Sequence, residues 1–106
     1  MEDSNEAEGA SKWPLSVRMS NEGLVCAFYC HASMENFLLI QEALTKAGAW
    51  KHAEHYSPFG STCEFTVGTA EIVLAFEWEE VPIIMYAKSN ADDEVLRVLA
   101  TALEQV

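Results

Sequence analysis

The chain has 106 residues, half of them hydrophobic, which is enough for one folded domain with a single core. Seventeen acidic against six basic residues give a formal net charge of −11, which excludes binding of nucleic acid phosphates or an anionic membrane through a basic surface. No apolar run approaches the roughly 20 residues of a membrane-spanning helix, and the acidic start is unlike a secretory signal, so we expect a cytoplasmic protein.

The beginning of the chain separates into a tail and two strands. Residues 1–11 (MEDSNEAEGAS) are acidic and lack apolar periodicity, which predicts a disordered acidic tail followed by a single domain over 12–106. Apolar and polar residues alternate from Trp13 to Met19, as in a half-buried strand. Turn-forming residues follow, and 24–31 is the next apolar segment, so we predict a hairpin.

A helix is predicted over 33–47. Ser33 can cap its first turn, and the helically spaced residues Phe37, Ile40 and Leu44 form its buried stripe. Gln41 is expected on the solvent side. Residues 49–60 (AWKHAEHYSPFG) show no clean period and are predicted to form a long connection.

The second half of the chain predicts three strands and a helix. Alternation marks strands over 62–67, 71–78 and 83–88, and Ser89 or Asn90 can cap a helix that runs to the end. The order β-β-α-β-β-β-α predicts an α+β fold, in which an antiparallel sheet of about five strands carries both helices on one face.

The three cysteines do not indicate a disulfide framework, because their number is odd. Cys26, Cys30 and His31 superficially resemble a metal cluster. However, residues four apart on a strand are about 13 Å apart, whereas ligands of one zinc ion lie within about 4 Å of each other. We therefore expect buried, inert thiols.

A second candidate metal site lies in the segment His52-Ala53-Glu54-His55. If this segment is helical, the two imidazoles share a face and could bind one metal ion, with Cys63 or His31 as a third ligand. The spacing does not match the His-Glu-x-x-His pattern of zinc proteases. The competing interpretation is two surface histidines in a loop, and no cofactor is predicted.

Nothing in the sequence indicates catalysis. The chain has neither a Gly-x-Ser-x-Gly nucleophile motif nor a glycine-rich phosphate loop. Glu77 and Glu79 share a strand face, but at the rim of a turn, where water keeps carboxylates ionised. We therefore expect a protein that is not an enzyme.

The two faces of the predicted sheet are both apolar. If Phe28, Phe65 and Met85 face the helices, a second apolar set points away from them: Val25, Ala27, Tyr29, Val73, Ala75, Ile84 and Tyr86. Five acids lie along or near that face: Glu64, Glu71, Glu77, Glu79 and Glu80. An apolar patch with an acidic rim is typical of a protein-binding surface. Alternatively, Trp50, Tyr56 and Phe59 of the 49–60 connection cover it.

These observations predict a non-catalytic protein-interaction domain. The expected partner is a basic protein, as for acidic inhibitors or immunity proteins, which share this size and charge. The candidate partner-binding residues are Tyr29, Glu64, Glu71, Glu77, Glu79, Ile84 and Tyr86. Two alternatives remain open. One is a homo-oligomeric structural module, such as a dimer formed through the same face; the other is a small-ligand or metal-binding domain that uses the 49–60 connection.

Overall fold

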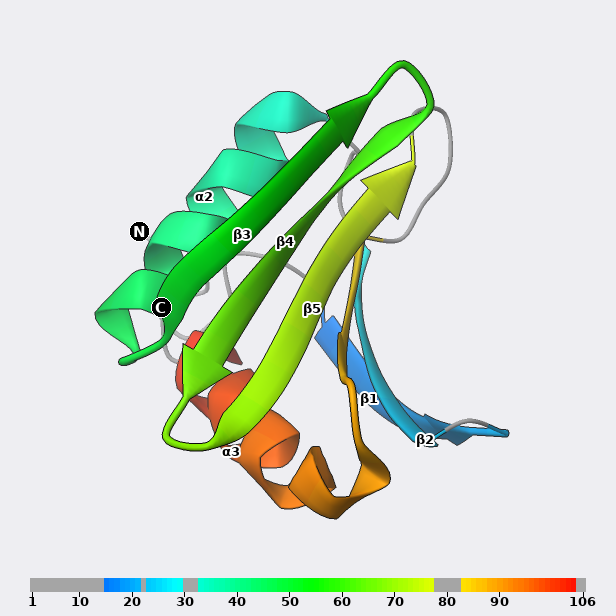
Figure 1. Ribbon diagram of the computed structural model, residues 1–106. Coiled ribbons are helices and arrows are strands. Elements are labelled where there is room, and N and C mark those ends of the chain that lie inside the picture. Colours follow the sequence, from blue (N-terminus) through cyan, green and yellow to red (C-terminus); the bar gives the residue numbers. More distant parts are fainter. Residues whose placement is uncertain (1–14, 22, 30–32, 78–82, 105–106) are drawn as a thin grey trace, which may run out of the picture.

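The computed structural model describes residues 15–21, 23–29, 33–77 and 83–104 (Figure 1). Its strands are β1 (Leu15–Ser20), β2 (Gly23–Phe28), β3 (Trp50–Ser57), β4 (Gly60–Val67), β5 (Ala70–Glu77) and β6 (Ile83–Ala87). Its helices are α2 (Met34–Lys46), a 3-10 turn η1 (Asn90–Asp92) and α3 (Asp93–Glu104). The predicted tail over 1–11 lies outside the described residues.

The strands form one antiparallel sheet in the order β1-β2-β6-β5-β4-β3. Both helices lie on the same face of this sheet (Figure 1), which confirms the predicted α+β fold. The number of strands is six rather than about five, and the element order is β-β-α-β-β-β-β-α.

The additional strand is β3, so the prediction of a long connection over 49–60 was wrong. Ser57 pairs with Gly60 across a two-residue turn, and its Oγ accepts hydrogen bonds from the backbone N–H groups of Phe59 and Gly60 at 3.1 and 3.2 Å. Pro58 and Gly60 stand at the second and fourth turn positions, as a type I turn favours. β3 shows no apolar alternation because it is an exposed edge strand.

The helices pack on the sheet through the predicted stripes. Ser33 caps α2, since its Oγ accepts a hydrogen bond from the backbone N–H of Asn36 at 3.1 Å. Phe37 of α2 packs against Phe76 of β5 with ring centroids 4.6 Å apart. Contrary to expectation, Gln41 is buried, because β3 lies beside this side of α2.

The core lies between the two helices and the inner face of the sheet. Its largest fully buried side chains are Phe28, Phe37, Phe65, Ile40, Leu44, Ile72, Leu74, Ile83, Met85, Leu96 and Leu103. Burial of each such side chain stabilises the fold by about 1.5–3 kcal/mol relative to exposure. Among the described helices, none is long and apolar enough to cross a membrane.

Candidate functional site on the outer face of the sheet

The outer face of the sheet is the one opposite α2 and α3. Among the described residues, no helix or strand is placed over this face (Figure 1). The predicted cover by the 49–60 segment is wrong, because this segment extends the sheet sideways as β3. Trp50 and Phe59 are 68% and 80% exposed there.

Six apolar side chains form two rows across the middle strands of this face. One row follows the cross-strand pairs Val25–Tyr86–Val73, and the next follows Ala27–Ile84–Ala75. Ala27 and Val73 are buried, and the other four are half-buried. We call these six residues the outer apolar patch.

A hollow of about 430 Å³ opens at one end of the outer apolar patch. Val25, Ile84 and Tyr86 of the patch line it, together with the polar side chains of Ser20 and Lys88. Its lining is mixed, with polar surface beside the apolar side chains, so it offers a partner both apolar contacts and hydrogen-bonding groups.

Tyr29 lies directly after β2 and is 45% exposed. Its hydroxyl oxygen accepts a hydrogen bond from Nη1 of Arg18 at 3.4 Å. Of the predicted partner-binding residues, Tyr29, Ile84 and Tyr86 are therefore all at least partly accessible.

The predicted acidic rim is less negative than the sequence suggested. Nζ of Lys88 lies 2.7 Å from Oε1 of Glu64 and 3.3 Å from Oε1 of Glu71. The hydrogen bond from Lys88 lowers the pKa of Glu64, and in return raises the pKa of Lys88. Glu77 is exposed, while Glu79 and Glu80 lie outside the described residues.

Sequence reasoning missed Lys88 as part of this surface. The signal was present, because Lys88 follows Ile84 and Tyr86 at the two-residue spacing that places side chains on one face of a strand. Its backbone N–H continues the ladder and donates to the carbonyl oxygen of Glu71 at 2.9 Å.

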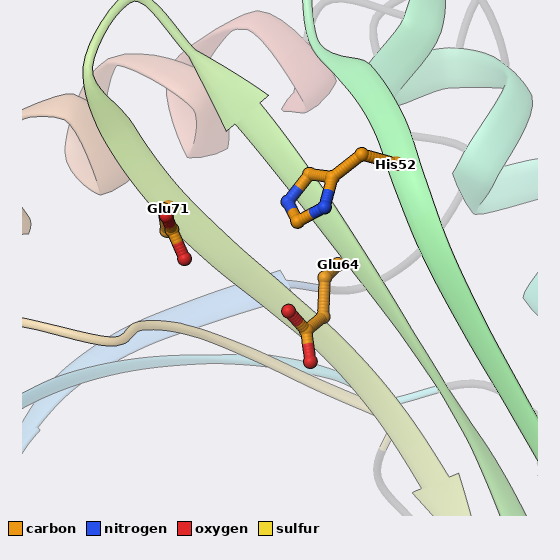
Figure 2. Close-up of side chains that lie close together, drawn as sticks. All are labelled: His52, Glu64 and Glu71. Atoms are coloured by element: carbon orange, nitrogen blue, oxygen red, sulfur yellow. The ribbon is translucent and has the colours of Figure 1, made fainter.

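Of the two histidines proposed as metal ligands, His52 alone belongs to a cluster of three metal-ligating side chains among the described residues. His52 lies beside Glu64 and Glu71, with one ligand atom of each residue within 4.8 Å of those of the other two (Figure 2). His55 is placed further along β3, opposite Thr62. Cys63 points into the core, and His31 lies outside the described residues.

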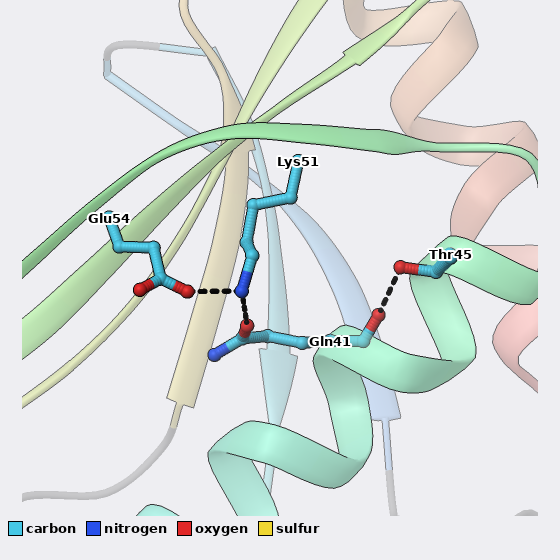
Figure 3. Close-up of polar contacts among 4 residues, drawn as sticks. All are labelled: Gln41, Thr45, Lys51 and Glu54. Atoms are coloured by element: carbon cyan, nitrogen blue, oxygen red, sulfur yellow. Dashed lines mark hydrogen bonds and ion pairs between the residues drawn. The ribbon is translucent and has the colours of Figure 1, made fainter.

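A polar network occupies the helix side of β3 (Figure 3). Nζ of Lys51 donates to Oε1 of Gln41 at 3.0 Å and forms an ion pair with Glu54. Oγ1 of Thr45 donates to the backbone carbonyl oxygen of Gln41 at 3.1 Å. Nε2 of Gln41 is buried and has no hydrogen-bond partner within the described part of the chain.

Three described groups, Cys26, Cys63 and Glu64, have shifted pKa values that bear on their charge at neutral pH. Burial raises the pKa of the Cys26 thiol to about 11, with a smaller opposing effect of Arg97. Burial likewise raises the pKa of Cys63 to about 11. Such thiols stay protonated at neutral pH, and the lowered pKa of Glu64 keeps that carboxylate ionised. Comparisons of the chain with family models, curated proteins and solved structures gave no match.

Proposed function

We propose that this protein is a non-catalytic interaction domain that binds a basic partner protein through the outer face of its sheet. The observation that carries the proposal is the outer apolar patch, which no described helix or strand overlies. Isolated apolar residues on a surface are ordinary, but a contiguous patch with polar residues around it favours a binding surface.

The hollow beside the patch supports a particular mode of binding. An apolar side chain of the partner would enter between Val25, Ile84 and Tyr86 and lose its contact with water there. The exposed hydroxyl group of Tyr29 at the margin of the patch would form a hydrogen bond with the partner. Affinity would come from this buried centre, and the surrounding polar residues would give specificity.

The net charge supports a basic partner. At −11, the chain attracts a positively charged protein over a distance and accelerates their encounter. Salt screens such attraction, with a Debye length of about 8 Å at physiological ionic strength. Association is therefore expected to slow as salt is added, whereas the contacts inside the hollow persist.

The test compares an outer-face variant with a variant on the opposite side. Ile84→Ser removes apolar surface from the patch, and Val98→Ser removes it from an exposed position of α3, which is 59% exposed. Partners captured from a native extract are identified, purified and titrated against each protein. We expect Ile84→Ser to weaken binding at least tenfold, or about 1.4 kcal/mol, and Val98→Ser to leave it unchanged.

Unfolding curves establish that both variants remain folded. Equal binding by a folded Ile84→Ser variant, or a captured partner that is acidic and insensitive to salt, would contradict the proposal. Light scattering at high protein concentration tests self-association. A stable dimer that the Ile84→Ser substitution dissociates would replace the basic partner with a second copy of this chain.

A further inference from the structure

A mixed set of metal-ligating side chains lies beside the outer apolar patch. His52 comes from β3, Glu64 from β4 and Glu71 from β5, three neighbouring strands of the sheet. One ligand atom of each lies within 4.8 Å of those of the other two. Figure 2 shows the imidazole of His52 extending from β3 over β4, on the side where both carboxylates lie.

The pairing of β3 with β4 is irregular at His52. The pairing of β3 with β4 shifts between Lys51, which lies opposite Phe65, and Ala53, which lies opposite Glu64. His52 is thus the extra residue of a β-bulge, a feature that redirects side chains and is frequent near binding sites. Regular pairing continued from Lys51 would also bring His52 next to Glu64, so this proximity follows from the register of β3 against β4 and does not require the bulge.

The two carboxylates already hold a cation. Nζ of Lys88 lies 2.7 Å from Oε1 of Glu64 and 3.3 Å from Oε1 of Glu71. This ammonium group pairs with the same two carboxylates that would bind a metal ion. The Lys88 side chain is 44% exposed, so it can turn into the solvent when another cation enters.

We propose that His52, Glu64 and Glu71 form a binding site for a divalent transition-metal ion, which displaces the ammonium group of Lys88. One imidazole nitrogen and two carboxylate oxygens are ligands for zinc or manganese, whereas magnesium and calcium prefer oxygen ligands throughout. Metal–ligand bonds of about 2.0–2.2 Å require the three ligand atoms to move slightly closer together. Water or a group of a partner would complete the coordination.

The metal site goes beyond the proposed function. Metal binding to it can be measured on the purified protein, without any partner protein. Its distinctive consequence concerns Lys88. A lysine that competes with the metal weakens metal binding, so its removal strengthens binding, although Lys88→Met also makes the local surface more negative. Lys46→Met removes the same charge at an exposed position of α2 outside the cluster and serves as the control for that general effect.

The experiment is calorimetric titration of chelator-treated protein with zinc chloride. We expect one equivalent to bind wild-type protein, at least tenfold weaker binding to His52→Ala, and at least threefold tighter binding to Lys88→Met. His55→Ala is the matched control, since His55 is an exposed histidine of the same strand that acts on the charge of Glu64 but is not one of the three clustered ligands. We expect it and Lys46→Met to bind as wild type does.

Titrations with magnesium chloride complete the design, with no binding expected. Absence of zinc binding to wild-type protein overturns the site. An equal loss of zinc affinity in His52→Ala and His55→Ala also overturns the site, because equal losses would indicate non-specific zinc uptake by surface histidines. Zinc uptake that Lys88→Met leaves unchanged contradicts the competition with lysine. None of these outcomes affects the partner-binding proposal, which Ile84→Ser tests.

Discussion

Nζ of Lys88 lies 2.7 Å from Oε1 of Glu64, although the two residues are 24 positions apart in the chain. β5 separates β4 from β6 in the sheet, so the lysine side chain reaches across one strand to form this contact. On the way it also meets Glu71. This pair links the acidic margin of the outer apolar patch to the candidate metal site.

Substitution of Lys88 is expected to change the titration of Glu64. The hydrogen bond from Lys88 is the main cause of the lowered pKa of Glu64, so Lys88→Met should raise that pKa toward the ordinary value of about 4.3. Carboxyl resonances followed by NMR during an acid titration measure it. Lys46→Met, at the exposed end of α2, is the control and should leave the pKa unchanged.

Lys88→Met should also change how the free energy of unfolding depends on pH, in a direction that follows from the lowered pKa of Glu64. A carboxylate whose pKa is lower in the folded than in the unfolded state stabilises the fold above about pH 4.3, and this contribution is lost as the pH falls through the lowered pKa. The difference in stability between wild type and Lys88→Met should therefore be present at pH 7 and shrink in acid. A difference that grows in acid would contradict this assignment.

Removal of the Phe37 ring should strongly destabilise the fold. Phe37 is fully buried and packs against Phe76 at 4.6 Å, so Phe37→Ala leaves a cavity between α2 and β5 and should lower the free energy of unfolding by about 3–5 kcal/mol. Urea denaturation measures the change. The adjacent Leu38 is 48% exposed, and Leu38→Ala should cost less than about 1 kcal/mol; similar losses for both variants would argue against the packing described.

Replacement of Gln41 by an apolar residue of similar volume should not destabilise the fold. Gln41→Met removes the buried Nε2 atom that lacks a partner, which offsets the lost hydrogen bond from Lys51. We expect the free energy of unfolding to stay the same or to rise by up to about 2 kcal/mol. Gln41→Ala should lie about 2–5 kcal/mol below Gln41→Met, because it creates a cavity. A strong loss with methionine would show that Nε2 has a role in stability.

The buried cysteines should resist modification in the folded protein. With a pKa of about 11, the thiols of Cys26 and Cys63 are almost entirely protonated at pH 8, and only the thiolate reacts. In a Cys30→Ser background, Ellman's reagent should react at least about 100-fold more slowly with native than with urea-unfolded protein. Rapid stoichiometric reaction of the native protein would contradict the burial of these residues.

Much of the fold could be predicted because its signals are local. Cys63, Phe65 and the following apolar residues alternate every second position, which identifies strands with one face in the core. Ser33 and the stripe through Phe37 and Ile40 identified α2 in the same way. β3 carried no such signal because nearly all of its side chains are exposed, whichever face they point to, and burial does not alternate along it. Its turn residues, Pro58 and Gly60, are the local feature that favours a hairpin.

The sequence by itself determined the α+β class, the core-facing residues and the apolar second face of the middle strands, since each depends on the spacing of neighbours along the chain. Only the tertiary structure decided that His52 meets Glu64 and Glu71, that Lys88 pairs with both of these acids and that Gln41 is buried. These contacts depend on the order in which strands pair and on the register of β3 against β4. Both are set by interactions between distant segments, which local periodicity does not record.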